Sequence, residues 1–241
     1  MDITQPPSVH RLSSLDIKLS PAPWPFETAN ETAIAAHFEE AKKRIPLLWN
    51  GRTLKLTRHD FSDGAFTGLC CETSYAAFLA WRDWGAPDRS ARNIFGSAIL
   101  RAADGALLYG VMGGHTATAG QIYPPGGNLD PADVMPDGRV DVVSAIHREL
   151  EEETGLAAGD LGCGELLVAF DGPRVSIAQV FDTDRPAEDL RRNILNHSAD
   201  SEEQELADIR IIRRPADLDS PGVVPYARAF ADYLLSANGG S

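Results

Sequence analysis

The sequence predicts a mixed α/β fold: an α/β/α sandwich, with helices on both faces of a mixed sheet, preceded by an N-terminal α/β extension. Segments with strand patterns are interspersed with segments of helical periodicity through most of the 241 residues. Two pairs of predicted strands are joined by turns containing Asp-Gly, at residues 103–105 and 171–173, which favours hairpins. The sequence contains no internal repeat. Strands and helices mixed in this order indicate helical layers around one sheet.

Residues 1–92 form the expected extension. Residues 1–20 are polar and precede the proline-rich run at 21–25, which predicts an arm outside the core. A helix is predicted at residues 28–44, which are rich in helix formers and end in basic residues. Two strand-like runs around a turn predict a hairpin at residues 54–69. A serine that can cap a helix predicts a second helix at residues 73–85. A boundary is expected after Pro87-Asp88-Arg89-Ser90.

Residues 93–241 form the expected second unit. Alternating apolar residues predict strands at residues 94–100, 106–112, 165–170, 175–181 and 209–212. Helical periodicity predicts helices at residues 142–154, 187–195 and 226–235. A glycine-rich loop at 113–127 and a proline-containing loop separate the first two strands from the first helix.

Composition excludes several classes of protein. Lys and Arg number 22 against 35 Asp and Glu, a net charge of −13 without any basic cluster, which argues against nucleic acid as a partner. Apolar runs are far shorter than the roughly 20 residues that span a bilayer, and the N-terminus lacks a secretory pattern, so we expect a cytoplasmic protein. The three cysteines form no C-x-x-C pair, which predicts buried or half-buried thiols rather than disulfides or zinc ligands.

Chemistry is concentrated on the predicted helix at residues 142–154. Glu149, Glu152 and Glu153 are spaced i, i+3 and i+4, so the three carboxylates share one helix face. The opposite face is apolar and is expected to face the core through Val142, Ile146 and Leu150. Carboxylates grouped in this way suit a hard cation such as Mg²⁺, although an isolated acidic run is more often a solvated helix face.

A nine-residue motif makes the solvated-face interpretation the weaker one. Residues 148–156 read Arg-Glu-Leu-Glu-Glu-Glu-Thr-Gly-Leu and match R-E-U-x-E-E-x-G-U, where U is aliphatic. This is the core of the nudix box, and Pro125-Gly126-Gly127 resembles the P-G-G entry of that motif. The chain therefore resembles the nudix hydrolases, with residues 93–241 as the hydrolase domain.

Two features depart from the full box, G-x5-E-x7-R-E. Twenty residues separate Gly127 from Arg148, so the loop carries an insertion, and Val140 stands where the box has its upstream Glu. That Glu is usually not among the innermost metal ligands of the family. Its replacement is therefore expected to alter metal number or affinity without abolishing catalysis.

The resemblance implies the cofactor, the reaction and the roles of the motif residues. Glu149, Glu152 and Glu153 would coordinate Mg²⁺ or Mn²⁺ together with the carbonyl of Gly126, and Arg148 would orient the carboxylates. The implied reaction is hydrolysis of a nucleoside diphosphate linked to another group. The general base would be a helix Glu or a carboxylate on a later loop, for which Glu205 resembles the position and Glu202 and Glu203 are competitors.

The N-terminal extension narrows the range of candidate substrates. Its helix, the run around Trp49-Asn50-Gly51, the hairpin and the segment Thr73 to Leu79 resemble the N-terminal layout of UDP-glucose-type nudix pyrophosphatases. This implies a nucleotide sugar as substrate, with a nucleoside monophosphate and a sugar phosphate as products. Four aromatic residues, Trp49, Tyr75, Trp81 and Trp84, could stack on a base or sugar or could belong to the core.

Other functions stay open at this point. ADP-ribose, dinucleotides and nucleoside triphosphates are alternative substrates within the same enzyme class. A nudix-fold module that binds a nucleotide without turnover is a second class, and a structural or interaction protein is a third. A homodimer is an expectation of the family alone.

Overall fold

One mixed sheet organises the protein. The computed structural model describes residues 6–238 except 47, 115, 117 and 202–204. Within these residues the strands are β1 (Ser8–Arg11), β2 (Ser14–Ser20), β3 (Arg52–Ser62), β4 (Ala65–Ser74), β5 (Arg92–Arg101), β6 (Leu107–Met112), β7 (Ile122–Tyr123), β8 (Gly162–Asp171), β9 (Arg174–Asp182) and β10 (Leu206–Ile212). Their order is β1-β8-β9-β5-β3-β4-β2, with β6 pairing β5, β7 and β10. The pairs β5–β9 and β2–β4 are parallel and the others antiparallel, so the predicted mixed sheet is confirmed.

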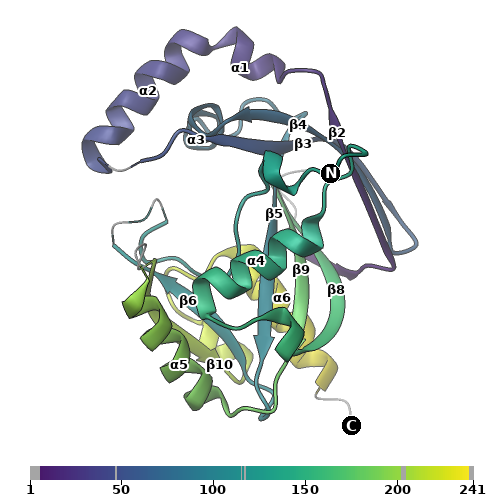
Figure 1. Cartoon of the computed structure of the whole chain (residues 1–241), viewed down its shortest axis with the longest axis vertical. Helices are drawn as coiled ribbons and strands as arrows, with labels where there is room; N and C mark the ends of the chain where they lie inside the picture. The colour runs from purple at the N-terminus through teal and green to yellow at the C-terminus, as the bar shows by residue number, and fades with distance from the viewer. Residues whose placement is uncertain (1–5, 47, 115, 117, 202–204, 239–241) are drawn as a thin grey trace.

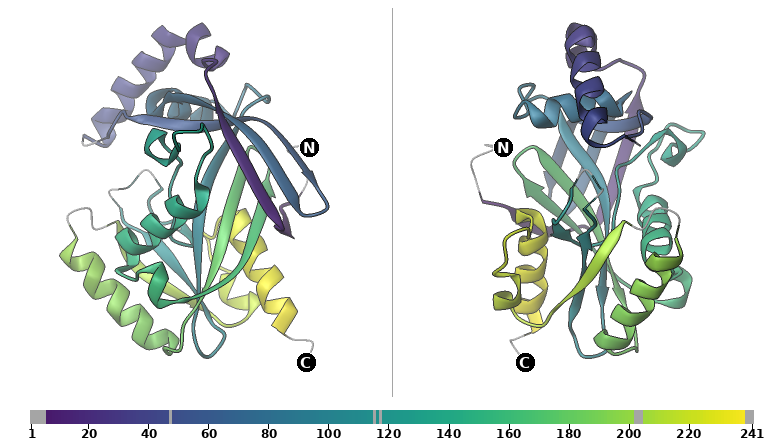
Figure 2. Two further views of the ribbon diagram at one scale, coloured as in Figure 1. Left: turned by 45° about the vertical axis from the view of Figure 1, so that its right-hand side comes forward. Right: turned by 90° about the vertical axis from the view of Figure 1, so that its left-hand side faces the viewer.

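Helices cover both faces of the sheet. They are α1 (Pro25–Ala29), α2 (Glu31–Arg44), α3 (Tyr75–Asp83), α4 (Val142–Thr154), α5 (Ala187–Asp200) and α6 (Pro225–Asn238), with short 3-10 turns at Pro131–Asp133, Ala158–Asp160 and Pro215–Leu218. Helices α4 and α5 lie on one face and α6 on the other, as the right-hand view of Figure 2 shows. Helices α1 to α3 pack together beside β3 and β4 at the end of the sheet where β5 begins (Figure 1).

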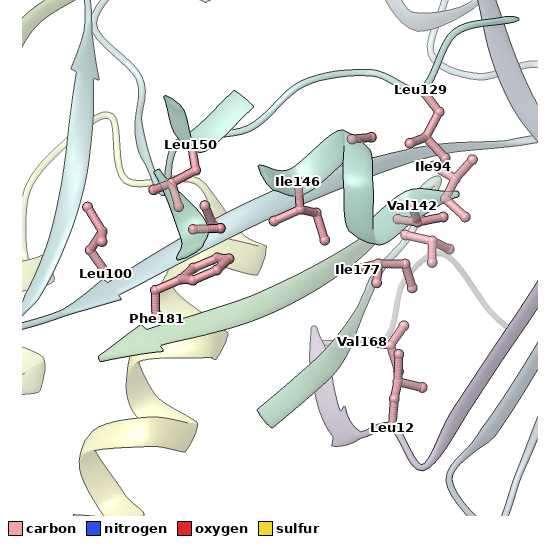
Figure 3. Close-up of a cluster of buried hydrophobic side chains, with 14 of the residues drawn as sticks. Leu12, Ile94, Leu100, Leu129, Val142, Ile146, Leu150, Val168, Ile177 and Phe181 are labelled. Carbon is pink, nitrogen blue, oxygen red and sulfur yellow. The ribbon is translucent and has the colours of Figure 1, made fainter. Parts of the chain in front are cut away.

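The packing of α4 determines where its carboxylates point. Val142, Ile146 and Leu150 are buried against the sheet, close to Ile177 and Phe181 (Figure 3). The opposite face of α4 is therefore directed away from the sheet.

Short-range signals set both ends of α4 and its distance from the sheet. The side chain of Asp141 accepts a hydrogen bond from the Ser144 backbone (3.0 Å), and Gly155 ends the helix at φ 71°. Gly96 on β5 permits the close approach, because a Cβ there would lie 2.7 Å from Cγ1 of Ile146.

The prediction of an N-terminal arm outside the core is wrong for the described part of residues 1–20. Strand β1 pairs with β8, and β2 pairs with β4, so the segment extends both ends of the sheet. Ile17 is buried, and Trp24, within the proline-rich run, is fully buried with its indole N–H donating to Asp88 (2.7 Å). These strands obtain their hydrogen bonds from distant partners, which a local polar composition does not reveal.

The helix predicted at residues 28–44 is divided at Asn30 into the end of α1 and the whole of α2. The other predicted helices and strands are confirmed, with longer strands than expected. Strand β7 lies in a segment that we expected to be loop. Cys70 and Cys71 are buried as predicted, whereas Cys163 is exposed, so that part of the thiol prediction is wrong. No helix in the described residues has the length and apolarity needed to cross a membrane. Strand β3 pairs with β5, so the sheet runs through the boundary at 92/93, and the division into two units stays a prediction.

Candidate active site

Four carboxylates from two elements meet at one hollow beside α4. Glu149, Glu152, Glu153 and Glu205 all line a cavity of about 200 Å³, which Ser198, Ser201 and Leu206 complete. Glu205 immediately precedes β10, so it reaches the helix carboxylates from a later loop, where the sequence placed it. Its predicted competitors Glu202 and Glu203 lie outside the described residues.

Glu153 has one carboxylate oxygen that lacks a partner. Its Oε1 accepts a hydrogen bond from the Gly126 backbone N–H (2.8 Å), while Oε2 is buried with no hydrogen-bond partner. Burial raises the pKa of Glu153 well above its ordinary value, and the neighbouring Glu149, Glu205 and Glu152 add to this rise against the Gly126 bond. The carboxylate therefore lies in a place where a negative charge is unfavourable without a counter-charge.

Glu149 interacts electrostatically with the other charged residues of the site. Burial, with smaller contributions from Glu152 and Glu205, raises its pKa to about 7 against the opposing effect of Arg148. The guanidinium of Arg148 bonds Glu149 (2.7 Å) and reaches Glu152 (3.5 Å). Arg148 thus contacts two of the three helix carboxylates, and its role in orienting them stays a prediction.

Asp133 is a site residue that sequence reasoning missed. Its carboxylate is almost completely buried and accepts hydrogen bonds from Arg148 (3.1 Å) and from the Asp130 backbone N–H (2.9 Å). Burial raises the pKa of Asp133, while those two donors lower it. Asp133 lies in the insertion between Gly127 and Arg148, so the insertion itself supplies the group that holds the arginine.

The Pro125-Gly126-Gly127 segment packs between β5 and α4 and has no space for side chains. A Cβ on Gly126 would lie 2.2 Å from the Gly96 carbonyl oxygen, and one on Gly127 would lie 2.5 Å from the Glu149 carboxylate. Backbone bonds from Gly96 to Gly127 (3.0 Å) and from Ala98 to Pro125 (2.7 Å) fix the segment. The N–H of Gly126 is the group that contacts Glu153, and the role of its carbonyl as a metal ligand stays a prediction.

The donor set fits a hard divalent cation. Among the described residues no three or more His, Cys, Asp or Glu side chains are already arranged around one point for a metal ion. However, the ligands at the cavity are carboxylates, which Mg²⁺ and Mn²⁺ prefer, and Oε2 of Glu153 is an unpartnered acceptor. A cation at this position would offset the burial and the mutual repulsion that raise the pKa values of Glu149 and Glu153.

A larger cavity adjoins the carboxylates. It has a volume of about 600 Å³, shares Glu149 and Glu205 with the smaller one, and extends to helix α3 of the extension. Its lining includes aromatic and donor side chains from α3, the sheet and α6: Tyr75, Phe78, Arg82, Asn93, Phe95, Arg174 and Tyr226. The cavity is large enough for a nucleotide-sized ligand whose one end lies at the carboxylates.

The four aromatic residues singled out in the sequence separate into three groups. Tyr75 lines the large cavity. Trp81 is buried in the core of the extension, and Trp49 and Trp84 are exposed. Of these four residues, only Tyr75 is placed for contact with a ligand in the large cavity.

Comparisons with known proteins find likenesses only among solved structures. No protein-family model matches the chain, and no curated protein matches it. The MutT protein from Methanosarcina mazei Go1 is 24% identical over 61% of this chain and 95% of its own, with a TM-score of 0.41. The M. smegmatis Nudix hydrolase RenU is 15% identical over 61% and 85% (TM-score 0.40), and the Nudix domain of Shewanella oneidensis NrtR, solved with ADP-ribose, is 14% identical over 69% and 99% (TM-score 0.40). Likenesses of this size do not assign an activity, which has to follow from the side chains of the site.

Proposed function

We propose that the protein is a nudix-type hydrolase that uses Mg²⁺ or Mn²⁺ to cleave the pyrophosphate of a nucleoside diphosphate linked to another group. The observation that carries the proposal is the meeting of Glu149, Glu152, Glu153 and Glu205 at one cavity, with an unpartnered oxygen on Glu153. A protein that only bound a nucleotide would have no need for four clustered carboxylates, because their repulsion destabilises the fold until a cation offsets it.

The residues divide the work of the reaction. Glu149, Glu152 and Glu153 hold the cation, which when bound neutralises pyrophosphate oxygens and makes water a better nucleophile near neutral pH. Arg148, itself held by Asp133, keeps Glu149 and Glu152 in position. Glu205 accepts the proton of the attacking water, with a Glu of helix α4 as the alternative base.

For the substrate we propose a nucleotide sugar such as UDP-glucose, cleaved to a nucleoside monophosphate and a sugar phosphate. The large cavity leads from the carboxylates to α3, so the extension contributes side chains where the base or the sugar would lie. ADP-ribose is the competing substrate, since a pyrophosphate with a flat base at one end would also enter this cavity.

A comparison of four substrates tests the proposal. We would measure kcat/KM for UDP-glucose, GDP-mannose, ADP-ribose and ATP with the same concentration of Mg²⁺, and repeat the series with Mn²⁺. The expected result is hydrolysis with preference for UDP-glucose. Preference for ADP-ribose would refute the assignment of UDP-glucose as the substrate but not the assignment as a hydrolase. Binding of these nucleotides without turnover of any of them would refute the assignment as an enzyme and indicate a nucleotide-binding module.

A further inference from the structure

A lysine without an acidic partner is buried behind the wall of the large cavity. Lys55 on β3 is fully buried, and burial lowers its pKa to about 7. It makes no ion pair with any described residue. Its Nζ donates to Oδ1 of Asn93 (2.5 Å) and lies 3.7 Å from the ring centroid of Phe78. A lysine buried in this way destabilises the fold, so its retention suggests a specific task.

The task suggested by the geometry is to fix the orientation of Asn93. Asn93 and Phe78 line the cavity, and Lys55 contacts both. An asparagine amide can present either its oxygen or its NH₂ group, whereas a protonated lysine can only donate. The bond from Lys55 to Oδ1 holds the amide of Asn93 in one orientation, in which its NH₂ group is the donor side and has no hydrogen bond to the described residues.

A second donor stands beside Asn93. Arg174 on β9 is the register partner of Asn93 on β5, and it also lines the cavity. Its NH2 group pairs with Asp171 (2.5 Å) and its guanidinium lies 5.6 Å from the ring centroid of Tyr226, but its buried Nε has no hydrogen-bond partner. Asn93 and Arg174 therefore add donors to the lining of a cavity whose other lining residues include the carboxylates Glu149 and Glu205.

We propose that Lys55 is a positioning residue that holds Asn93 as a hydrogen-bond donor, and that Asn93 and Arg174 select a flat base with carbonyl oxygens on its edge, as uracil has. The aromatic side chains of Phe78, Phe95 and Tyr226 in the same wall provide faces for such a ring. Cytosine carries an amino group where uracil carries its second carbonyl, so donors of the protein would face a donor of the base. This inference rests on the proposed function and names the part of the substrate that the extension helps to recognise.

The test compares UDP-glucose with CDP-glucose, which share the sugar and the pyrophosphate. The wild type should prefer UDP-glucose by about tenfold in kcat/KM, the value of roughly one hydrogen bond. Lys55→Met should lower the ratio of the two kcat/KM values at least about threefold, because the amide is then free to turn. Lys18→Met, which removes an exposed lysine on β2, should leave the ratio unchanged.

A second variant covers the case in which Lys55→Met does not fold. Asn93→Asp replaces the donor with an acceptor that can still pair with Lys55, so the preference should shift towards CDP-glucose. In the Asn93→Ala background, Lys55→Met should have no further effect on the ratio. If Lys55 had only a structural role, Lys55→Met would lower kcat/KM equally for UDP-glucose and CDP-glucose in every background, which would refute the proposal. Equal hydrolysis of the two substrates by the wild type would refute it as well.

Ligand binding separates this inference from the proposed reaction. Calorimetric titration with UMP and CMP needs no turnover, and tighter binding of UMP that depends on Asn93 would support the base selection. Absence of hydrolysis with this preference intact would refute the proposed function alone. Equal affinity for UMP and CMP would refute the role of Lys55 and Asn93.

Discussion

Replacement of Glu153 by Gln should stabilise the metal-free protein while removing its response to Mg²⁺. The amide has the shape of the carboxylate and its oxygen can still accept the hydrogen bond from Gly126. Its NH₂ group carries no charge at the position where Oε2 is buried without a partner. Because the folded-state pKa of Glu153 lies above its unfolded value, native stability falls as the pH rises above about 4.5. The amide variant removes this loss.

The size of the effect follows from the negative charge, because the amide NH₂ occupies the same position without a partner. A neutral polar group buried without a partner costs about 1–3 kcal/mol and a charged one costs more, so we expect a difference of about 1–3 kcal/mol. For a chain of 241 residues each kcal/mol corresponds to roughly 2–4 °C in the unfolding midpoint, so Glu153→Gln should raise Tm by about 2–12 °C in EDTA at pH 7.5.

Thermal unfolding followed by circular dichroism, with EDTA and with excess Mg²⁺, measures both parts of the prediction. Wild type should gain stability from Mg²⁺ by mass action, about 2.7 kcal/mol at a hundred times Kd, and Glu153→Gln should gain much less. Glu151→Gln is the matched control, because it removes one charge from an exposed position on the same helix. The reasoning fails if Glu153→Gln melts like the wild type in EDTA and keeps the full Mg²⁺ shift.

Three further predictions concern other parts of the site. Lys55→Met should change the pH dependence of stability: the folded-state pKa of about 7 lies below the ordinary 10.5, so wild type should gain about 1.4 kcal/mol per pH unit relative to the variant between these values, up to about 5 kcal/mol. Urea unfolding at pH 6, 7.5 and 9 tests this, and parallel curves would contradict it. Gly126→Ala should lower activity and stability together, since its Cβ would lie 2.2 Å from the Gly96 carbonyl, and an unchanged Tm would show that the loop can move. Glu205→Gln should lower kcat much more than it changes KM in steady-state assays, and an unchanged kcat would assign the base to the helix.

Helix α4 could be predicted from the sequence to the residue because its signals are local. Asp141 and Gly155 mark its ends, and the apolar positions repeat at helical spacing. The carboxylate face followed from the same periodicity, whereas Glu205 was suggested by the family resemblance, which places a carboxylate on a loop a few residues before a strand. Each of these features depends on residues within a few positions of one another.

Features that depend on long-range contacts could not be predicted in this way. Strands β1 and β2 are short and polar, and they exist because β8 and β4 offer free edges. Asp133 lies 15 positions before Arg148 and contacts it only because the insertion folds back onto α4. Lys55 and Asn93 are 38 positions apart and meet because β3 pairs with β5. Such pairings depend on the register of the sheet, which no local pattern specifies.

The central claim is that the carboxylate face of α4 is a metal-dependent hydrolytic site, and one comparison tests it most directly. We would measure turnover of the best substrate at saturating Mg²⁺ for the wild type, Glu152→Gln and Glu151→Gln, two adjacent substitutions that remove the same charge from one helix. Glu152 lines the cavity and Glu151 does not. We predict that Glu152→Gln loses at least about a hundredfold in kcat with unchanged circular dichroism, while Glu151→Gln stays near the wild type. Near-normal turnover by Glu152→Gln, or equal losses in both variants, would contradict the claim.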